Sequence, residues 1–162
     1  MEREEAEWVV QRHGQTVYRL AYARTGNRED AEDVTQETFL RLVRAAPKFR
    51  DEDHCRAWLL RVAANCAQDL FRAPWRKRER PIEEAERVPA PGQVPEPGGV
   101  LEAVLSLPES YRLPVHLFYY EDYSVARIAE ILHSREGTVK SQLNRGRQLL
   151  KTKLMEAWND DE

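Results

Sequence analysis

The fold of this chain is decided by residues 124–150, which read SVARIAEILHSREGTVKSQLNRGRQLL. Two apolar stripes at helical spacing run through it, separated by a short turn. The first stripe is Val125, Ile128, Ala129 and Leu132, and the second is Val139, Leu143, Gly146, Leu150 and Leu154. The spacing of each stripe is that of an amphipathic helix. The stretch therefore predicts a helix-turn-helix, in which a short packed helix precedes a longer one.

The second helix of this pair is rich in cations and hydroxyls between its apolar positions. These polar side chains are Lys140, Ser141, Arg145, Arg147, Lys151 and Lys153. An α-helix fits the major groove of B-DNA, where such side chains reach base edges and phosphates. The stretch therefore favours duplex DNA as the ligand of the second helix.

The charge of the chain is distributed unevenly. The net charge of −3 argues against a nucleic-acid ligand, but residues 56–80 hold seven basic and two acidic side chains. Residues 133–153 hold six basic side chains and one acidic side chain, whereas residues 81–122 hold two basic and eight acidic ones. Two cationic blocks around an acidic one indicate two surfaces that face polyanions.

A break in composition separates two halves of the chain. Residues 81–99 contain five of the nine prolines and three of the seven glycines, without any amphipathic period. Because proline fixes φ and removes a hydrogen-bond donor, this segment predicts an extended, semi-rigid tether. The domain boundaries that follow are an N-terminal domain at 1–80, a linker at 81–100, a helix-turn-helix domain at 101–155 and an acidic tail at 156–162.

Both halves are expected to be helical, because strand signals are nearly absent and the fold class is therefore all-α. In the N-terminal half, Gly26 predicts the end of a first helix and Asn27 caps the next. That helix is expected to reach Ala46, where Pro47 stops it, and a polar loop at 47–54 follows. A further helix holds the apolar residues from Trp58 to Leu70.

In the C-terminal half, Pro108 predicts the start of a helix. Pro114 either kinks that helix or restarts it. Leu117, Phe118 and Tyr120 are expected to supply core.

Signals for catalysis, metal binding and membrane insertion are weak. The acids between Glu29 and Glu37 crowd one helix start, where they are most simply explained by the helix dipole. The four histidines lack ligand spacing, and no glycine-rich phosphate loop is present. Cys55 and Cys66 are expected to be free thiols of a reducing compartment. Since no apolar run approaches the ~20 residues of a membrane span and no leader is evident, we expect a cytoplasmic protein that is not an enzyme and needs no metal or cofactor.

The basic block at 56–80 interleaves cations with aromatic side chains. Single-stranded DNA is bound by such a combination, because cations follow the backbone and aromatic rings stack on bases. Trp58 lies among apolar neighbours, which favours a place in the core over a stacking platform. Asn65 fits a buried position and a base contact equally well.

Four motifs in this order resemble a known family. They are YRLAY at 18–22, GNREDAEDVTQETFL at 26–40, AWLLRVAAN at 57–65 and GTVKS at 137–141. Together they are similar to the extracytoplasmic-function sigma factors of bacterial RNA polymerase, in their minimal two-domain form. The resemblance covers both halves and leaves out mainly the linker.

The resemblance implies roles for particular residues. One helix would dock on the polymerase core, with Asp33, Gln36, Glu37 and Leu40. The loop from Pro47 to about Arg56, including Phe49, would capture a flipped base of the −10 promoter element. Melted −10 DNA would lie on Asn65, Arg72, Arg76 and Lys77. The duplex −35 element would be read by Arg135, Thr138, Lys140, Ser141 and Arg145.

The resemblance also implies partners. They are the β and β′ subunits of the polymerase core, promoter DNA and a restraining anti-sigma factor, often anchored in the membrane, with no small-molecule substrate. The family pattern usually has glycine where this chain has His133, a residue that tolerates a left-handed turn better than most. It also has arginine frequently where this chain has Gln142.

Two other functions fit part of the sequence. A stand-alone helix-turn-helix regulator would bind a palindromic operator as a dimer. A helical adaptor would use its basic faces to bind acidic proteins. The −10-like N-terminal half argues against the first, and the helix-turn-helix argues against the second.

Overall fold

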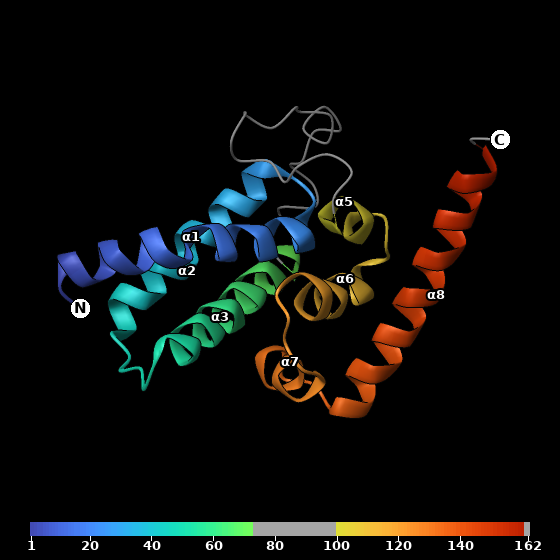
Figure 1. The fold of residues 1–162 in the computed structure, drawn as a ribbon. Helices are drawn as coiled ribbons and strands as arrows, with labels where there is room; N and C mark the ends of the chain where they lie inside the picture. The colour runs from blue at the N-terminus through green and yellow to red at the C-terminus, as the bar shows by residue number, and fades with distance from the viewer. Residues whose placement is uncertain (73–99, 161–162) are drawn as a thin grey trace. The chain divides into compact units, whose positions relative to one another are not determined.

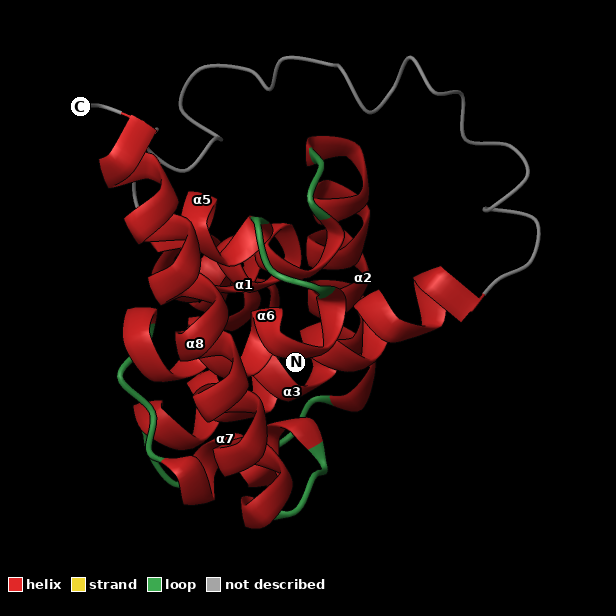
Figure 2. Cartoon of the chain, turned by 90° about the vertical axis from the view of Figure 1, so that its right-hand side faces the viewer, coloured by secondary structure: helices red, strands yellow, loops and turns green. Residues whose placement is uncertain are grey.

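The computed structural model describes residues 1–72 and 100–160, and within those ranges every regular element is a helix (Figures 1 and 2). This confirms the all-α prediction. The chain divides into two compact units between Val94 and Pro95. Each unit is a small helical body with its own core, and each is described by itself.

The described part of the N-terminal unit, residues 1–72, contains three helices that pack pairwise on one another. They are α1 (Arg3–Thr25), α2 (Arg28–Ala45) and α3 (Glu52–Arg72). Its core contains Val17, Leu20, Val34, Leu42, Leu59, Leu60 and Ala63. Because three amphipathic helices each bury one stripe here, the opposite faces remain available for contacts with other molecules.

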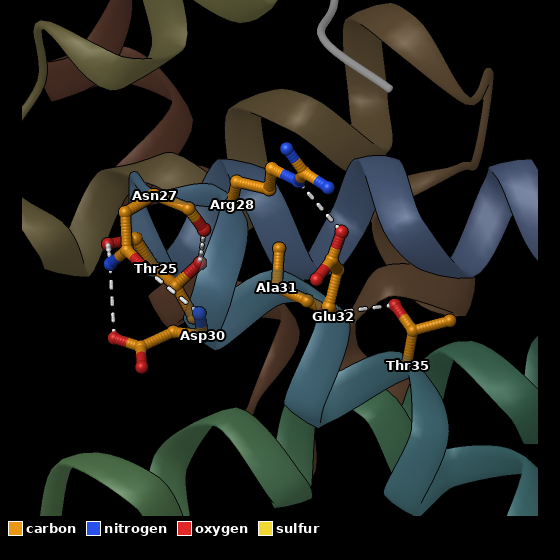
Figure 3. Close-up of polar contacts among 7 residues, drawn as sticks. All are labelled: Thr25, Asn27, Arg28, Asp30, Ala31, Glu32 and Thr35. Carbon is orange, nitrogen blue, oxygen red and sulfur yellow. Dashed lines mark hydrogen bonds and ion pairs between the residues drawn. The ribbon is translucent and has the colours of Figure 1, made fainter. Parts of the chain in front are cut away.

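The turn between α1 and α2 is fixed by the residues that the sequence singled out (Figure 3). Gly26 takes a left-handed conformation with φ of 77° at the end of α1. Asn27 caps α2, because its Oδ1 accepts from the Asp30 N–H at 2.9 Å while its Nδ2 donates to Asp30 Oδ2 at 3.0 Å. The Thr25 hydroxyl donates to the Ala21 carbonyl at 2.8 Å. The predicted helix stop and cap are both confirmed, and they set the direction in which α2 leaves α1.

The second turn is shorter than the sequence predicted. After α2 ends at Ala45, α3 begins at Glu52, so the expected loop at 47–54 is wrong at its far end. The Asp51 carboxylate accepts from the His54 N–H at 2.7 Å, and His54 Nδ1 accepts from the Arg50 N–H at 3.1 Å. The polarity of this stretch indicated a loop, but an Asp before two acidic residues is also the start of a helix.

Residues 100–160 of the C-terminal unit form five helical segments. They are α5 (Val100–Leu105), α6 (Glu109–Val115), the π-helix η2 (His116–Tyr120), α7 (Val125–Leu132) and α8 (Glu136–Asp160). The start of α6 after Pro108 is as expected. Helix α5 was not predicted, and it begins at the last residue of the expected linker. Helix α8 continues through residues 156–160, which were expected to belong to a tail.

Pro114 does not restart a helix, because it lies inside α6, one residue before the end of that helix. The chain passes through it and widens into η2, where the Glu121 N–H donates to the His116 carbonyl at 3.2 Å. A π-turn changes the number of residues per turn, so a period of 3.6 no longer assigns the buried side chains. Leu117 is buried as expected, but Tyr120 is exposed, which corrects its assignment to the core. Tyr123 is buried in the same unit.

The helix-turn-helix itself is formed by α7 and α8. The Ser124 hydroxyl caps α7 by accepting from the Arg127 N–H at 3.2 Å. His133 ends α7 with φ of 51°, so this residue does adopt the left-handed turn. The buried side of α7 holds Ile128, Ala129 and Ile131. Val125 and Leu132, which the predicted stripe included, are only half-buried, and they are the first and last residues of α7.

In α8, the predicted stripe is buried at Val139, Leu143 and Gly146 and half-buried at Leu150. The side chain of Leu154 lies outside the described residues. None of the helices in the described ranges is long and apolar enough to cross a membrane.

Candidate functional site

The solvent-facing side of α8 gathers most of the side chains expected to read DNA. Because Val139 and Leu143 point into the core, residues 138, 141 and 145 emerge on the other side of the helix at 100° per residue. One groove is lined by Arg135, Thr138, Ser141 and Arg145, together with Tyr111, Gly137 and Gln142. The structure thus brings together four of the five residues predicted for the −35 element.

Lys140 does not line this groove. It lies about 100° around the helix from Ser141, on the side that also carries Arg147 and Lys151. The Arg147 guanidinium stands over the rings of Phe118 and Tyr119, with its central carbon 5.6 Å from each centroid. A cation–π contact of this kind fixes Arg147 beside η2. Lys140 and the groove residues therefore face different parts of any ligand.

The cations of the groove are not neutralised by carboxylates. Within residues 1–72 and 100–160, Arg135 and Arg145 have no ion-pair partner, and neither does Lys140 on the neighbouring side of α8. Arg145 Nη1 approaches the Gln148 side-chain oxygen at 3.5 Å. Thr138 and Ser141 are exposed residues as well. Exposed cations with exposed donors at helical spacing suit a phosphate-lined groove with base edges at its floor.

Tyr111 of α6 is a groove residue that the sequence did not reveal. Its phenol has no hydrogen-bond partner among the described residues, and it lies beside residues more than twenty positions away in the chain. No motif of the helix-turn-helix includes it, because its position depends on the packing of α6 against α8. From the sequence alone, a tyrosine in the first turn of a helix would simply be assigned to the core.

The outward face of α2 carries the residues predicted to dock on the polymerase core. Asp33, Gln36 and Leu40 follow one another at spacings of three and four, and Leu40 is 43% exposed. Val43, one turn further on, is exposed as well. Sequence reasoning missed Val43, although it continues the same spacing. An exposed apolar pair flanked by polar groups is typical of a protein-binding face.

Glu37 is held in place by its neighbours rather than projecting freely. Its carboxylate pairs with the Arg41 guanidinium at 3.2 Å and with Arg44 at 3.9 Å. Arg41 also reaches Asp69 of α3 at 3.7 Å. Glu37 therefore contributes charge to the α2 face while it links α2 to α3.

The residues predicted to hold the −10 strand lie on the loop before α3 and on α3 itself. The half-buried Phe49 ring packs edge-on against His54 at 5.4 Å and Trp58 at 5.8 Å, which fixes its orientation. Trp58 is half-buried, so it is less buried than the place in the core that the sequence favoured. Asn65 is exposed and thus available for contact with a base.

Of the other residues predicted to contact the −10 element, only Arg56 has a side chain within the part of the chain that the structure describes. Arg56 is half-buried in the first turns of α3 rather than in a loop. Arg72 is the last residue of α3, and its side chain lies outside the described residues, as do Arg76 and Lys77 altogether.

A histidine and two cysteines are among the titratable side chains buried in the N-terminal unit. Burial lowers the pKa of His13, whose Nε2 lies 4.0 Å from Glu52, while Arg12 pairs with the same carboxylate and lowers the pKa of Glu52. Cys55 and Cys66 are free and buried, and desolvation raises the pKa of both thiols. Within the described ranges, no three His, Cys, Asp or Glu side chains gather into a metal-binding cluster.

Comparison with known proteins assigns both units. The family profile of sigma-70 region 2 matches residues 9–77, and that of sigma-70 region 4 matches residues 99–150. The ECF RNA polymerase sigma factor SigW of Bacillus subtilis is 30% identical over 165 residues, covering 90% of this chain and 87% of SigW. The chain belongs to the ECF RNA polymerase sigma factors. As a sigma factor, it is a subunit that directs RNA polymerase core to promoter DNA at the start of transcription.

Two further relatives of this ECF sigma factor are informative. SigE of Mycolicibacterium smegmatis is 39% identical over 155 residues, which cover 90% of this chain but 60% of SigE. The sigma factor RpoE of Bartonella quintana, solved in complex with the anti-sigma factor NepR, has the same fold with a TM-score of 0.67 and 20% identity. That match covers 94% of this chain and 98% of RpoE. The match of residues 9–77 to region 2 sets aside the stand-alone operator-binding regulator.

Proposed function

We propose that this ECF sigma factor docks on RNA polymerase core through the outward face of α2, holds the melted −10 strand on residues 46–51 and α3, and reads the duplex −35 element with α8. One observation carries this proposal. The groove lined by Arg135, Thr138, Ser141 and Arg145 belongs to one compact unit, and the exposed α2 face belongs to the other.

The two-unit arrangement suits the energetics of promoter opening. Extruding a base costs a few kcal/mol for lost stacking and pairing. A surface that binds extruded bases offsets part of that cost, whereas a groove that reads base edges requires intact duplex. A protein that does both needs two surfaces, and this chain carries one on each unit.

The proposed partners follow from the two surfaces. The β and β′ subunits of the core would meet α2 through Asp33, Gln36, Glu37 and Leu40. We further propose a restraining anti-sigma factor that is anchored in the membrane. It would cover the α2 face and the α8 groove. The anti-sigma factor NepR seen in complex with RpoE supports such a partner. We further propose that the chain acts in the cytoplasm, has no catalytic activity of its own and requires no cofactor.

Run-off transcription tests this function. Purified chain and bacterial core enzyme are incubated with a library of genomic promoter fragments, and starts that depend on the chain are mapped. The expected result is a set of starts that share a −35 and a −10 element. If no start depends on the chain across the library, the proposal is wrong.

A matched pair of variants separates the two surfaces. Leu40→Asp should weaken binding to core polymerase by about tenfold or more while leaving binding to a −35 duplex unchanged, because it places a charge in an apolar contact. Arg145→Ala should weaken −35 binding by about 10- to 100-fold while leaving core binding unchanged. Loss of both activities in either variant would mean that the surfaces have been assigned wrongly.

A further inference from the structure

Asn144 lies on the side of α8 that points away from the core. It is exposed, whereas Val139 and Leu143 of the same helix are buried. At about 100° per residue, Ser141 stands opposite the mean direction of the two buried side chains, and Asn144 lies about 60° from Ser141. Arg145 lies about 40° from Ser141 in the other direction. Asn144 therefore flanks Ser141 on the side opposite the groove, and it does not line the groove itself.

This placement matters for a helix that lies in a major groove. The side chains opposite the core of such a helix point to the base edges, and those further around it point to the phosphates. Ser141 is the residue opposite the core, so Asn144 and Arg145 lie over base edges on either side of it. Lys140, about 100° from Ser141, lies nearer to the phosphates.

Three carboxamide side chains lie between residues 135 and 150, and their surroundings differ. Gln142 is half-buried and lines the groove together with Tyr111. The side-chain oxygen of Gln148 lies 3.5 Å from Nη1 of Arg145. The Asn144 amide has no hydrogen-bond partner within residues 1–72 and 100–160. Among these three carboxamides, Asn144 is the one that combines exposure with a donor and an acceptor that no described residue uses.

The helix itself gives asparagine no role at this position. Position 144 lies well inside α8, away from both ends, where an asparagine could act as a cap. Asparagine has a lower helix propensity than alanine, lysine or glutamate, because its amide competes for backbone hydrogen bonds. An exposed asparagine without a contact in the fold is therefore best explained by a ligand.

The chemistry of the carboxamide selects one base. In the major groove, adenine presents the N6 amino group as donor and N7 as acceptor, and asparagine matches both at once. Guanine presents two acceptors there, and cytosine presents a donor alone. We propose that Asn144 reads an adenine of the −35 element, with its oxygen accepting from N6–H and its amide donating to N7. This inference rests on the proposed reading of the −35 duplex by α8.

Base preferences measured on the full chain test the proposal. The chain selects duplexes from a pool with a randomised segment, and gel shifts then give its affinity for the selected duplex and for each single base-pair change. Asn144→Ala and Asn144→Asp are compared with the original chain. Gln148→Ala is the matched control, because it removes another exposed carboxamide one turn further along α8. Both positions are exposed, so the three variants should remain folded.

The original chain should prefer A·T at one base pair by about tenfold or more. Asn144→Ala should lose the preference at that pair and keep the others, and Asn144→Asp should shift it to cytosine, whose N4 amino group donates to a carboxylate. Gln148→Ala should keep the adenine preference. The inference is overturned if Asn144→Ala keeps every preference, or if it weakens binding to all duplexes equally, as loss of a phosphate contact would. If the original chain selects no duplex sequence, the proposed reading of the −35 element fails as well.

Discussion

Gly146 of α8 lies so close to Val115 of α6 that a β-carbon at position 146 would stand 2.7 Å from Cγ2 of Val115. The same β-carbon would be 3.8 Å from Cβ of Tyr111. Glycine at this position allows α8 to approach α6, and that approach places Tyr111 at the edge of the groove. The geometry of the DNA-facing surface therefore depends on a residue inside the core.

Gly146→Ala is expected to destabilise the C-terminal unit. Overpacking costs about 1–3 kcal/mol, which exceeds the ~1 kcal/mol that alanine gains over glycine in a helix. Urea unfolding should report the loss, and the loss should be smaller in a Val115→Ala background. Gly137→Ala is the control, because a β-carbon there meets no atom within 4 Å, and it should not destabilise. Equal stability of Gly146→Ala and the original chain would contradict the close approach.

Tyr111→Phe is expected to weaken −35 binding without changing the stability of the fold. The substitution removes only the phenol hydroxyl, which has no partner among the described residues and lines the groove. A hydrogen bond to DNA is worth about 0.5–1.5 kcal/mol, so affinity should fall about two- to tenfold. Gel-shift titrations on −35 duplex measure the change, and an unaltered affinity would place the hydroxyl away from DNA.

Lys140→Ala and Arg145→Ala are expected to weaken −35 binding in different ways. Lys140 lies outside the groove, so its loss should weaken binding to all sequences equally and reduce the salt dependence by about one counterion. Arg145 lies in the groove, so its loss should also reduce discrimination between promoter and mutated −35 sequences. Affinities of both variants for the promoter duplex and for the mutated −35 duplex, measured at several salt concentrations, separate the two effects. Identical effects on discrimination would mean that both residues bind only phosphate.

His133→Gly is expected to stabilise the helix-turn-helix. The residue has φ of 51°, a left-handed conformation that costs an L-residue about 1 kcal/mol or more and glycine almost nothing. His133→Ala is the matched control, because alanine removes the imidazole but keeps the strain, and it should show no gain. The thermal unfolding midpoint of the C-terminal unit is measured for the original chain and for the two variants. A gain in both variants would trace the effect to the imidazole instead.

Acid is expected to destabilise the N-terminal unit through His13. Burial lowers its pKa below the ordinary 6.5, so the unfolded chain binds a proton that the folded chain resists. The penalty is absent at about pH 7.5 and grows as the pH falls below about 6.5, although nearby Glu52 partly offsets it. His13→Gln should flatten the dependence of the unfolding midpoint between about pH 7.5 and 5.5. An unchanged slope would assign the acid sensitivity to other groups.

Much of the fold could be predicted from local chemistry. Gly26 and Asn27 ended one helix and capped the next as expected, because a left-handed glycine and a capping amide act within a few residues. The left-handed turn at His133 agrees with the tolerance expected of that residue. The errors lay where two local signals compete, as at Asp51, whose polarity suits a loop and whose carboxylate caps a helix.

Some residues of the candidate sites could be predicted from the sequence, and others could not. The spacing of Thr138, Ser141 and Arg145 along one helix predicts that they lie together, because a helix fixes which side chains share a face. Neither Tyr111 nor the groove between Trp8 of α1 and Pro47 and Phe49 of the loop after α2 could be found in this way. Each is formed by segments distant in sequence, and which side chains meet depends on how the helices pack.

The sequence by itself determined the all-α class, the end of α1 at Gly26, the cap of α2 at Asn27, the split into two halves and the face of α8 that carries Thr138, Ser141 and Arg145. Tertiary structure alone decided that Tyr111 lines the groove, that the chain widens into a π-helix after Pro114, and that Trp8 stays exposed beside Phe49. The physical reason is the range of the interactions. Helix periodicity and capping act over three or four residues, whereas the close approach at Gly146 and the grooves arise from side chains that meet only when separate helices pack.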